Sequence, residues 1–404
     1  MGSNTEFAIN NVDFGKTVSR AEHLGLRDLA VIAWRDLEAP DSGGSEEHLT
    51  QVTKHWTNAG LSVNIRTAGV QGLPAQVERN GSKVIRKGGR VSVFPGAAFQ
   101  VLRGGLGSAD GVIDVFQGMP FLSPLWTRRP RVGLIHHCHM GTWSDLAPIG
   151  LAQLGYCIER FAIRHIYRST PLVTLSPSSA EEIVKCMKIK SEQLRVGPVG
   201  IDSDFTPDTT SGETEIPLVV AGGRFMPPKG FDQIPAILSP VKKKIPALQA
   251  VIFGDGPEKS RIESQIQKYS AEDWITLPGF ISREDQISLY QKAKLLIAPS
   301  RREGWNMTIT EAAACGTPAV ATKIPGHLDA VMNQQTGYLV ENDYEMAEAI
   351  IAGLSDESKR IEMRKNSLEH AQKFRWEHTA AIILNALCDD CLLYTSDAAD
   401  EGLG

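Results

Sequence analysis

The sequence predicts an α/β protein built from two consecutive doubly wound domains, each a parallel sheet with helices on both faces. Short apolar runs alternate with helical segments along most of the chain, which is typical of parallel sheets. A polar segment rich in Thr, Asp, Ser and Glu, residues 202–216, interrupts this pattern, and the pattern then begins again. The length of 404 residues also exceeds what one hydrophobic core usually holds.

The first domain is expected to follow the polar leader, and its first strand is the apolar run DLAVIAW, residues 28–34. A helix follows over residues 45–60, where apolar residues recur on one face and Gly60 ends the pattern. Further apolar runs of strand length predict four more strands, at residues 61–68, 111–118, 131–139 and 171–176.

The second domain repeats the alternation of strand and helix. Five apolar runs predict strands at residues 217–224, 248–256, 274–279, 293–300 and 318–322. Helical segments lie between them, with the sequences GFDQIPAILSPV, EKSRIESQIQKY and REDQISLYQKA. Ligands of such sheets gather at the carboxyl ends of the strands, so two facing domains imply a binding cleft between them.

The predicted boundaries follow from these patterns. In chain order the parts are a leader (residues 1–27), a first domain (28–201), a linker (202–216), a second domain (217–374) and a tail (391–404). The tail, CLLYTSDAADEGLG, shows neither a helical nor a strand period and is expected to be a non-native addition that replaces the natural end of the chain.

Composition excludes several classes of protein. No apolar run reaches the roughly 18 residues that a membrane span needs, and the first residues carry no apolar signal core. The six cysteines are mostly scattered, which favours reduced thiols in the cytoplasm. No zinc-finger spacing or aromatic RNA-binding motif is present, so no nucleic-acid partner is expected.

Charge is distributed unevenly between the two halves, although the net charge is only −5. Residues 1–200 hold 22 Lys and Arg against 17 Asp and Glu, whereas the remainder holds 20 against 30. A basic first half suits an anionic substrate or surface. Chance variation of surface charge explains the asymmetry equally well, and both explanations stay open.

Two glycine-containing loops fall at expected strand ends. Gly43 and Gly44 precede a helix, where missing Cβ atoms allow close approach of a ligand and the helix N-terminus favours an anion. A tight turn is the alternative. Gly254 and Gly256 form G-x-G without a third glycine, so the dinucleotide fingerprint is incomplete. A plain turn is the simpler role there, although its backbone could flank a nucleotide base.

A pair of cations lies in the stretch GGRFMPPKG, residues 222–230, just before a helix. Arg224 and Lys229 flank a Pro-Pro turn at a strand-to-helix crossing, where two cations are placed to hold a diphosphate. The alternative is two solvated surface charges.

The stretch EGWNMTITEAAACGTP, residues 303–318, holds two glutamates eight positions apart. Thr308 and Glu311 read as a capping box, which gives Glu311 a structural alternative. Capping does not require Glu303, which lies in the loop beyond a strand. The amides of the loop from Gly304 to Thr308 lead into a helix N-terminus and are expected to face the ligand.

This stretch resembles the signature of the retaining glycosyltransferases of family 4, which have the two-domain GT-B fold. The glutamates show that family's E-x7-E spacing, and the diglycine loop, the GGRFMPPKG and GDGP stretches and a late FRWEHTA occur in the family's order. The resemblance covers residues 28–388 and implies that a final helix, residues 375–390, crosses back to the first domain.

The resemblance implies that the second domain holds a nucleoside-diphosphate sugar. Glu311 would bind the ribose, and Glu303 would bind hydroxyls of the transferred sugar. Arg224 and Lys229 would neutralise the diphosphate without a metal ion or other cofactor. Further contacts would come from the loop that follows Glu303 and from the glycines, namely Gly304, Trp305, Asn306, Met307, Thr308, Gly254, Gly256, Gly43 and Gly44.

The first domain is expected to bind the acceptor and to supply a histidine near the donor sugar. His139 in IHHCHMGTW best fits that place, with His137 as the fallback and a structural role for either still open. A subset of the family has a similar H-H-x-H-x-x-x-W stretch, to which Trp143 belongs. Four adjacent metal-ligand types on a strand cannot converge, so no metal site is expected. The one D-x-D, Asp202–Asp204, falls in the linker.

One departure from the family pattern affects the sugar site. Asn306 stands where many relatives carry glycine. Asparagine tolerates left-handed backbone, so the loop can keep its shape, but the side chain would narrow the sugar pocket.

The predicted function is transfer of a sugar, with retention of anomeric configuration, to a glycan, a lipid-linked sugar or a small molecule. The predicted location is the cytoplasm, with peripheral contact at the inner membrane face if the acceptor is lipid-linked. Another GT-B enzyme, such as a phosphorylase or an epimerase, is the first alternative. A nicotinamide oxidoreductase and a non-catalytic sugar-nucleotide binder are the others.

Overall fold

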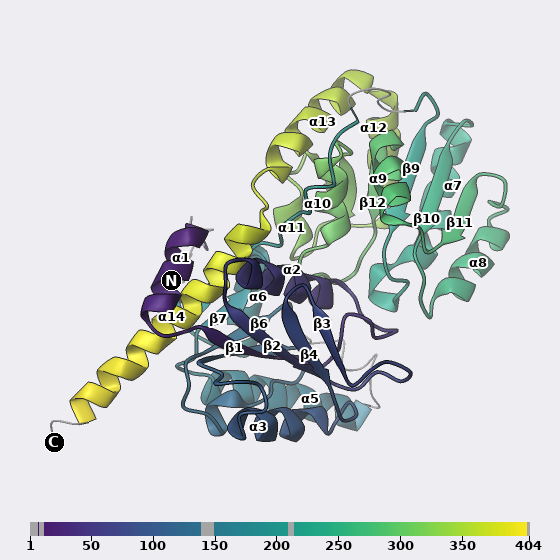
Figure 1. Ribbon diagram of the computed structural model, residues 1–404. Helices are drawn as coiled ribbons and strands as arrows, with labels where there is room; N and C mark the ends of the chain where they lie inside the picture. The colour runs from purple at the N-terminus through teal and green to yellow at the C-terminus, as the bar shows by residue number, and fades with distance from the viewer. Residues whose placement is uncertain (1–6, 8–11, 139–148, 209–213, 402–404) are drawn as a thin grey trace. The chain divides into compact units, whose positions relative to one another are not determined.

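A computed structural model describes residues 7, 12–138, 149–208 and 214–401 of the chain, and Figure 1 shows it as a ribbon. The chain forms two compact units. Unit 1 contains residues 1–200 and 376–404, and unit 2 contains residues 201–375. The main chain therefore passes between the units twice, between Gly200 and Ile201 and again between Arg375 and Trp376.

Unit 1 is organised around an eight-stranded sheet with the order β3-β4-β2-β1-β5-β6-β7-β8. All neighbouring strands are parallel except β3 and β4. The strands are β1 (Asp28–Ile32), β2 (Ser62–Thr67), β3 (Gln76–Arg79), β4 (Ser82–Arg86), β5 (Gly111–Phe116), β6 (Arg131–Ile135), β7 (Leu172–Thr174) and β8 (Leu194–Val196).

Helices cover both faces of this sheet, with α3 and α5 on one face and α2 and α14 on the other (Figure 1). Both faces being covered explains why four successive residues of β1, Leu29 to Ile32, are all buried. The helices are α1 (Phe14–His23), α2 (Gly44–Asn58), α3 (Val93–Leu102), α5 (Ile149–Phe161), α6 (Pro177–Met187) and α14 (Trp376–Glu401).

Unit 2 has a six-stranded, fully parallel sheet with the order β11-β10-β9-β12-β13-β14. Its strands are β9 (Leu218–Gly222), β10 (Gln249–Phe253), β11 (Ile275–Gly279), β12 (Leu295–Ala298), β13 (Ala319–Thr322) and β14 (Gly337–Val340). Its helices are α7 (Ile234–Lys244), α8 (Lys259–Lys268), α9 (Arg283–Lys292), α10 (Met307–Ala314), α11 (His327–Ala330), α12 (Asp343–Ser355) and α13 (Glu357–Ala371).

Alternate residues of the central strands of unit 2 enter two different hydrophobic cores. Val219 of β9 packs in the core that also contains α7, α8 and α12, whereas Val220 packs in the core that contains α9 and α10. Leu295 and Leu296 of β12 divide in the same way. This is the two-residue period of a strand with both faces buried, and it confirms the predicted class of two doubly wound domains.

Residues 1–27, which the sequence suggested to be a polar leader, contain a helix packed on unit 1. They contain α1, whose N-terminus is capped by Asp13, which accepts a hydrogen bond from the Lys16 amide at 2.8 Å. Arg20 of α1 forms an ion pair with Asp389 of α14 at 2.6 Å. The helix is therefore held to the body of unit 1.

The expected linker and tail contain more structure than their local composition suggested. In the linker, the Phe205 side chain is buried in a core of unit 2. Asp202 of the same segment forms an ion pair with Arg283 at 2.5 Å. The tail from residue 391 does contain helix, since α14 continues to Glu401 and buries Cys391. In both cases tertiary packing determines the conformation where local composition suggested none.

The strands β3, β4, β8 and β14 were not expected from the sequence. β3 and β4 form an antiparallel hairpin around a two-residue turn, Asn80-Gly81, in which φ is 49° and 76°. Positive φ at both positions is the geometry that favours Asn-Gly between paired strands. This signal was present in the sequence, although the flanking residues are too polar to suggest strands.

Candidate functional site

The loop that follows β12 places Glu303 beside a cation from the loop that follows β9. The Lys229 Nζ donates to Glu303 Oε1 at 2.7 Å, and the Ser300 hydroxyl donates to the same oxygen at 2.8 Å. The Glu303 side chain is 10% exposed and that of Lys229 is 29% exposed. Two of the residues predicted from the sequence are thus brought together at the carboxyl ends of neighbouring strands.

Backbone contacts fix these two loops against each other. The Arg301 amide donates to the Pro228 carbonyl at 2.7 Å. Gly230 has a φ of 68°, and a Cβ at that position would lie 2.5 Å from the Pro299 carbonyl oxygen. The close approach explains why glycine follows the Pro-Pro-Lys turn, and it holds Lys229 within reach of Glu303.

Asn306 marks the start of α10 with a left-handed backbone, φ 80° and ψ 84°. The expected tolerance of asparagine for this conformation is confirmed. Its amide nitrogen lies 2.9 Å from His327 Nε2, and its carbonyl oxygen accepts from the Thr308 hydroxyl at 2.8 Å. The Asn306 side chain is buried and is engaged on both sides by these contacts.

The predicted capping box is wrong. α10 begins at Met307, so Thr308 is its second residue rather than its N-cap, and Glu311 lies in the second turn. Glu311 is buried and accepts from Gln286 of α9 at 3.0 Å. Burial, together with the negative charge of Glu311, raises the pKa of Cys315 to about 12. Glu311 therefore does not cap α10, which was the structural alternative that the sequence offered for this residue.

His327 is a residue of this site that the sequence analysis missed. Its Nδ1 lies 2.9 Å from the Thr322 carbonyl, which can only accept, so Nδ1 carries the proton and Nε2 accepts from Asn306. Burial lowers the pKa of His327 to about 4, and the nearby charges of Glu303 and Lys229 oppose each other there. A neutral imidazole therefore orients Asn306.

A glycine brings His327 to the loop. Gly326 has a φ of 84°, and a Cβ there would lie 2.7 Å from the Trp305 amide nitrogen. Gly-His, separated from a predicted strand by three residues, was the available sequence signal, but the partner of His327 is 21 residues earlier in the chain and becomes visible only in the fold.

Trp305 contributes to the core of unit 2 through its side chain. The indole is buried, lies edge-on to Phe374 with 4.9 Å between ring centroids, and donates to the Thr310 hydroxyl at 3.3 Å. Only the backbone of Trp305 is left for the predicted ligand contact. The same restriction holds for Gly304, which has no side chain.

Gly254 and Gly256 are required by backbone packing. With φ of 132° and 153°, they let the loop after β10 pass against the loop after β9. A Cβ on Gly254 would collide with the Gly223 carbonyl oxygen, and the Phe225 amide donates to the Asp255 carbonyl at 2.8 Å. These contacts support the simpler turn role and also position the segment that carries Arg224.

Arg224 follows β9 in the same loop as Lys229 and is half-buried. Its carbonyl accepts from the Met226 amide at 2.8 Å, which forms a tight turn before the Pro-Pro pair. Both predicted cations therefore come from one short loop of unit 2.

In unit 1, Gly43 is the N-cap of α2 and its backbone is extended, with a φ of −160°. Its amide donates to Glu46 Oε2 at 2.7 Å. Glu46 is buried and its other oxygen accepts from Arg35 at 3.0 Å. The Gly43 amide is thus hydrogen-bonded within its own helix. This agrees with a tight turn, the alternative that the sequence left open for Gly43 and Gly44.

The histidine stretch begins where β6 ends. His136 and Cys138 are buried, and His136 Nε2 lies 3.3 Å from Nδ1 of His48. His137, between them, is half-buried. This alternation agrees with the strand period. His139 and Trp143 lie outside the described residues, so the structure does not place the histidine that the resemblance favours.

Among the described residues, no group of three or more His, Cys, Asp or Glu side chains is arranged to hold a metal ion. Within the same part of the chain, no helix has the length and apolar character required to span a bilayer.

The sequence of this chain is similar to those of known glycosyltransferases. Residues 207–370 match the family model described as glycosyl transferases group 1. A D-inositol 3-phosphate glycosyltransferase from Stackebrandtia nassauensis is 25% identical over 418 residues, which cover 93% of this chain and 94% of that protein. A human protein, one subunit of phosphatidylinositol N-acetylglucosaminyltransferase, is 25% identical over 72% of this chain and 61% of its own length.

Solved structures of similar fold agree. Sucrose-phosphate synthase from Thermosynechococcus elongatus has a TM-score of 0.73 at 22% identity, covering 87% of this chain and 96% of that one. The Anabaena protein HepE in complex with UDP-glucose has a TM-score of 0.69 at 18% identity, covering 90% and 98%. The chain has the GT-B fold, as predicted, and residues 207–370, which lie in unit 2, match the group 1 glycosyl transferase model.

Proposed function

We propose that the protein transfers a sugar from a nucleoside-diphosphate sugar to a hydroxyl of an acceptor, with retention of anomeric configuration and without a metal ion. The observation that carries the proposal is the Lys229–Glu303 pair at the carboxyl ends of β9 and β12. Ligands of doubly wound sheets bind at that edge, and the pair supplies one charge for a diphosphate and one for sugar hydroxyls.

The geometry of Glu303 supports its role toward the sugar. Among the described residues, both hydrogen bonds to this carboxylate are accepted by Oε1, from Lys229 and from Ser300. A carboxylate has room for further donors on its second oxygen. Glu303 Oε2 would therefore accept a hydroxyl of the transferred sugar while Oε1 stays anchored.

The cations have the complementary task. Lys229 is held by Glu303 before a donor arrives, so its ammonium is already placed when a phosphate oxygen enters. Together with Arg224 from the same loop it would neutralise the charge that develops on the leaving diphosphate. Stabilising developing charge with fixed groups is usually the largest single contribution that a protein makes to such a reaction.

The remaining donor contacts come from elsewhere in the chain. Glu311 would bind the ribose hydroxyls, because its carboxylate is buried and does not cap α10. Backbone amides between Gly304 and Thr308 would contact the sugar and phosphate, with Asn306 and Met307 among them. His139 of unit 1 would lie near the donor sugar, and Gly43 and Gly44 would meet the phosphate or the acceptor.

We infer that the acceptor carries a phosphate. The names of the two relatives above refer to D-inositol 3-phosphate and to phosphatidylinositol, and both of these compounds carry a phosphate on inositol. In this chain, Arg35 and Arg90 each lie 5.4 Å from the Trp34 ring centroid, beyond the carboxyl end of β1. Asp41 pairs with both arginines, at 3.7 Å and 2.6 Å, in the position that a phosphate could take.

A screen for stabilisation and turnover tests the proposal. UDP-, GDP- and ADP-sugars are first compared for thermal stabilisation of the full chain. The stabilising donor is then incubated with D-inositol 3-phosphate, the compound named for the bacterial relative, and, separately, with unphosphorylated inositol. The proposal predicts a glycosylated product with the α or β configuration of the donor and no change on adding EDTA. Inversion, or loss of activity with EDTA, would reject the mechanism.

The alternatives predict different outcomes in the same screen. A phosphorylase would require inorganic phosphate, and an epimerase would convert the donor without an acceptor. A nicotinamide oxidoreductase would be stabilised by NAD rather than by a sugar nucleotide. A non-catalytic binder would show stabilisation without turnover of any donor.

We infer a cytoplasmic protein that touches the inner membrane face peripherally. Large apolar side chains are exposed on α3 and α5, including Phe99, Leu102 and Phe161, each more than half exposed. Arg103 lies 4.4 Å from the Phe99 ring centroid, so a cation accompanies the apolar surface. Co-sedimentation with anionic vesicles that drops in a Phe99→Ser variant would support the contact, and equal binding to neutral vesicles would count against it.

A further inference from the structure

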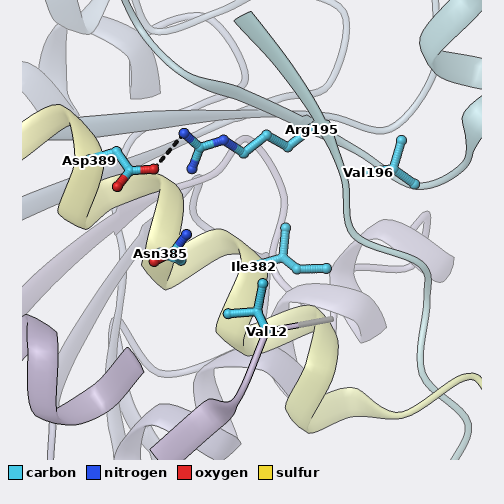
Figure 2. A pocket seen from close by; sticks show the side chains of 6 residues that line it. All are labelled: Val12, Arg195, Val196, Ile382, Asn385 and Asp389. Carbon is cyan, nitrogen blue, oxygen red and sulfur yellow. Dashed lines mark ion pairs between the residues drawn. The ribbon is translucent and has the colours of Figure 1, made fainter. Parts of the chain in front are cut away.

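A cavity of about 200 Å³ lies within unit 1, between the edge strand β8 and helix α14. Figure 2 shows its walls, with Arg195 reaching from β8 toward Asp389 of α14. Its lining residues come from three separate segments and are Val12, Arg195, Val196, Ile382, Asn385 and Asp389. Its volume is well below the roughly 300–1,000 Å³ of sites for drug-sized ligands, so it suits a small ion.

The charges at the cavity do not balance. Asp389 is the carboxylate in the wall, and its two oxygens pair with two guanidinium groups, Oδ1 with Arg20 and Oδ2 with Arg195, each at 2.6 Å. One carboxylate compensates one of two cations. The cluster is left with a net charge of +1 next to the cavity, which favours an anion there.

A buried donor of Arg195 points to the same conclusion. The Nη2 atom makes the ion pair with Asp389, whereas the buried Nη1 atom has no hydrogen-bond partner within the part of the chain that the structure describes. Buried polar atoms are nearly always hydrogen-bonded, so one without a partner calls for an explanation, and an unidentified ligand is one.

Asn385 supplies a second donor at the cavity wall. Its carbonyl oxygen accepts from Arg20 Nη1 at 2.5 Å, and this bond fixes which side of the amide holds the oxygen. The NH2 group is consequently turned away from Arg20. Two hydrogen-bond donors, one of them charged, then face a small space whose other walls include the apolar side chains of Val12 and Ile382.

We propose that this cavity binds a small phosphate-bearing anion, held by Arg195 Nη1 and the Asn385 amide, at a site separate from the donor and acceptor residues. A guanidinium fork presents donors that match phosphate oxygens, and the apolar walls suit the carbon skeleton of a small phosphate ester. Asp389 remains neutralised by Arg20, so it does not repel the bound anion.

The position of the cavity gives the bound anion a consequence. Val196 precedes the first crossing between units at Gly200, and Ile382 follows the second crossing at Trp376. The Thr379 hydroxyl donates to the Pro198 carbonyl, so the two segments already touch. An anion held by β8 and α14 together would further restrain both segments from which the connections to unit 2 start.

Hydrogen exchange of the full chain tests the site with inorganic phosphate as the probe and with chloride at equal ionic strength as the reference. UDP is present in all samples, so that phosphate does not report on the donor site. We expect phosphate to slow exchange in peptides that span 194–200 and 376–390. Equal slowing by chloride, or no slowing by phosphate, would overturn the proposal.

Variants separate the site from general charge effects. Arg195→Gln removes the donor but leaves Asp389 paired with Arg20, and we expect about tenfold or greater loss of phosphate affinity. Asn385→Ala should also weaken binding. Arg261→Gln, which removes an exposed arginine of unit 2, is the matched control and should bind phosphate as the wild type does. Unchanged affinity in Arg195→Gln, with its melting temperature retained, would reject the proposal.

Discussion

Replacing Glu303 by glutamine isolates the charge of this residue from its shape. In the Glu303→Gln variant the side chain would keep its length and could still accept from the Ser300 hydroxyl, but its bond to Lys229 would no longer be between opposite charges. Removing one group that stabilises charge at a reacting centre typically costs about 100- to 1,000-fold in rate, or about 2.7–4 kcal/mol. We expect kcat/KM to fall by that amount.

Stability should change much less. The Lys229 side chain is 29% exposed and Glu303 is 10% exposed, so solvent screens the pair and its loss should cost about 1 kcal/mol of unfolding free energy. Nucleotide affinity should stay within about threefold, because the proposal assigns the ribose to Glu311 rather than to Glu303. Steady-state kinetics, calorimetric titration with UDP and urea unfolding measure the three quantities.

Glu341→Gln is the matched control for this experiment. Glu341 also pairs with a lysine of unit 2, Lys323, at 2.8 Å, but both side chains are more than half exposed and neither belongs to the loop of Glu303. The control should leave kcat/KM unchanged. Equal losses of turnover and of UDP affinity in Glu303→Gln would refute the assigned role of Glu303, because they would show that the residue binds the nucleotide as a whole.

Other predictions concern pH, packing and the acceptor. Burial lowers the pKa of His327 from about 6.5 to about 4, so the unfolded chain binds a proton first, and His327 alone should lower the stability by about 3 kcal/mol as pH drops from about 6.5 to about 4. Urea unfolding across this range should show a smaller loss in His327→Gln, and an equal loss would contradict the assignment. Gly254→Ala should destabilise unit 2 by about 3 kcal/mol or more, because its Cβ would meet the Gly223 carbonyl oxygen at φ 132°; a melting temperature near that of the wild type would contradict this. Arg90→Ala should raise KM for a phosphate-bearing acceptor by about tenfold and leave UDP binding unchanged, and an unchanged KM would remove the arginine from the acceptor site.

The sequence predicted the fold class because each buried parallel strand is a short continuous apolar run, which can be recognised without knowing its partners. β9 and β12 are continuous apolar runs, and each residue that packs in one core is followed by one that packs in the other. The expectation that Lys229 and Glu303 lie at one site came only from the family resemblance. The structure adds its physical cause, since β9 and β12 are neighbours in the sheet and their following loops must meet.

The role of Glu311 shows where local patterns mislead. Thr308 and Glu311 have capping-box spacing, but α10 starts two residues earlier than that motif requires, after the left-handed Asn306. The start is determined by the contact of Asn306 with His327, which lies on a separate element. A spacing rule that considers one helix alone cannot include such a partner.

Long-range partners also explain the features that the sequence did not predict. Arg20 and Asp389 lie at opposite ends of the chain and meet only because α14 returns to unit 1. Phe205 sits in a polar segment, yet it packs beside Tyr290 of α9, with 6.1 Å between ring centroids. Composition within a short window gives no information on either contact.

A crystal structure of the chain with a bound nucleoside-diphosphate sugar is the most direct test of the central claim. The account predicts one donor molecule in unit 2, with its diphosphate against Lys229 and Arg224, its ribose against Glu311 and a sugar hydroxyl on Glu303 Oε2. A donor bound away from these four side chains, or a Lys229–Glu303 pair left intact with no ligand contact, would contradict it.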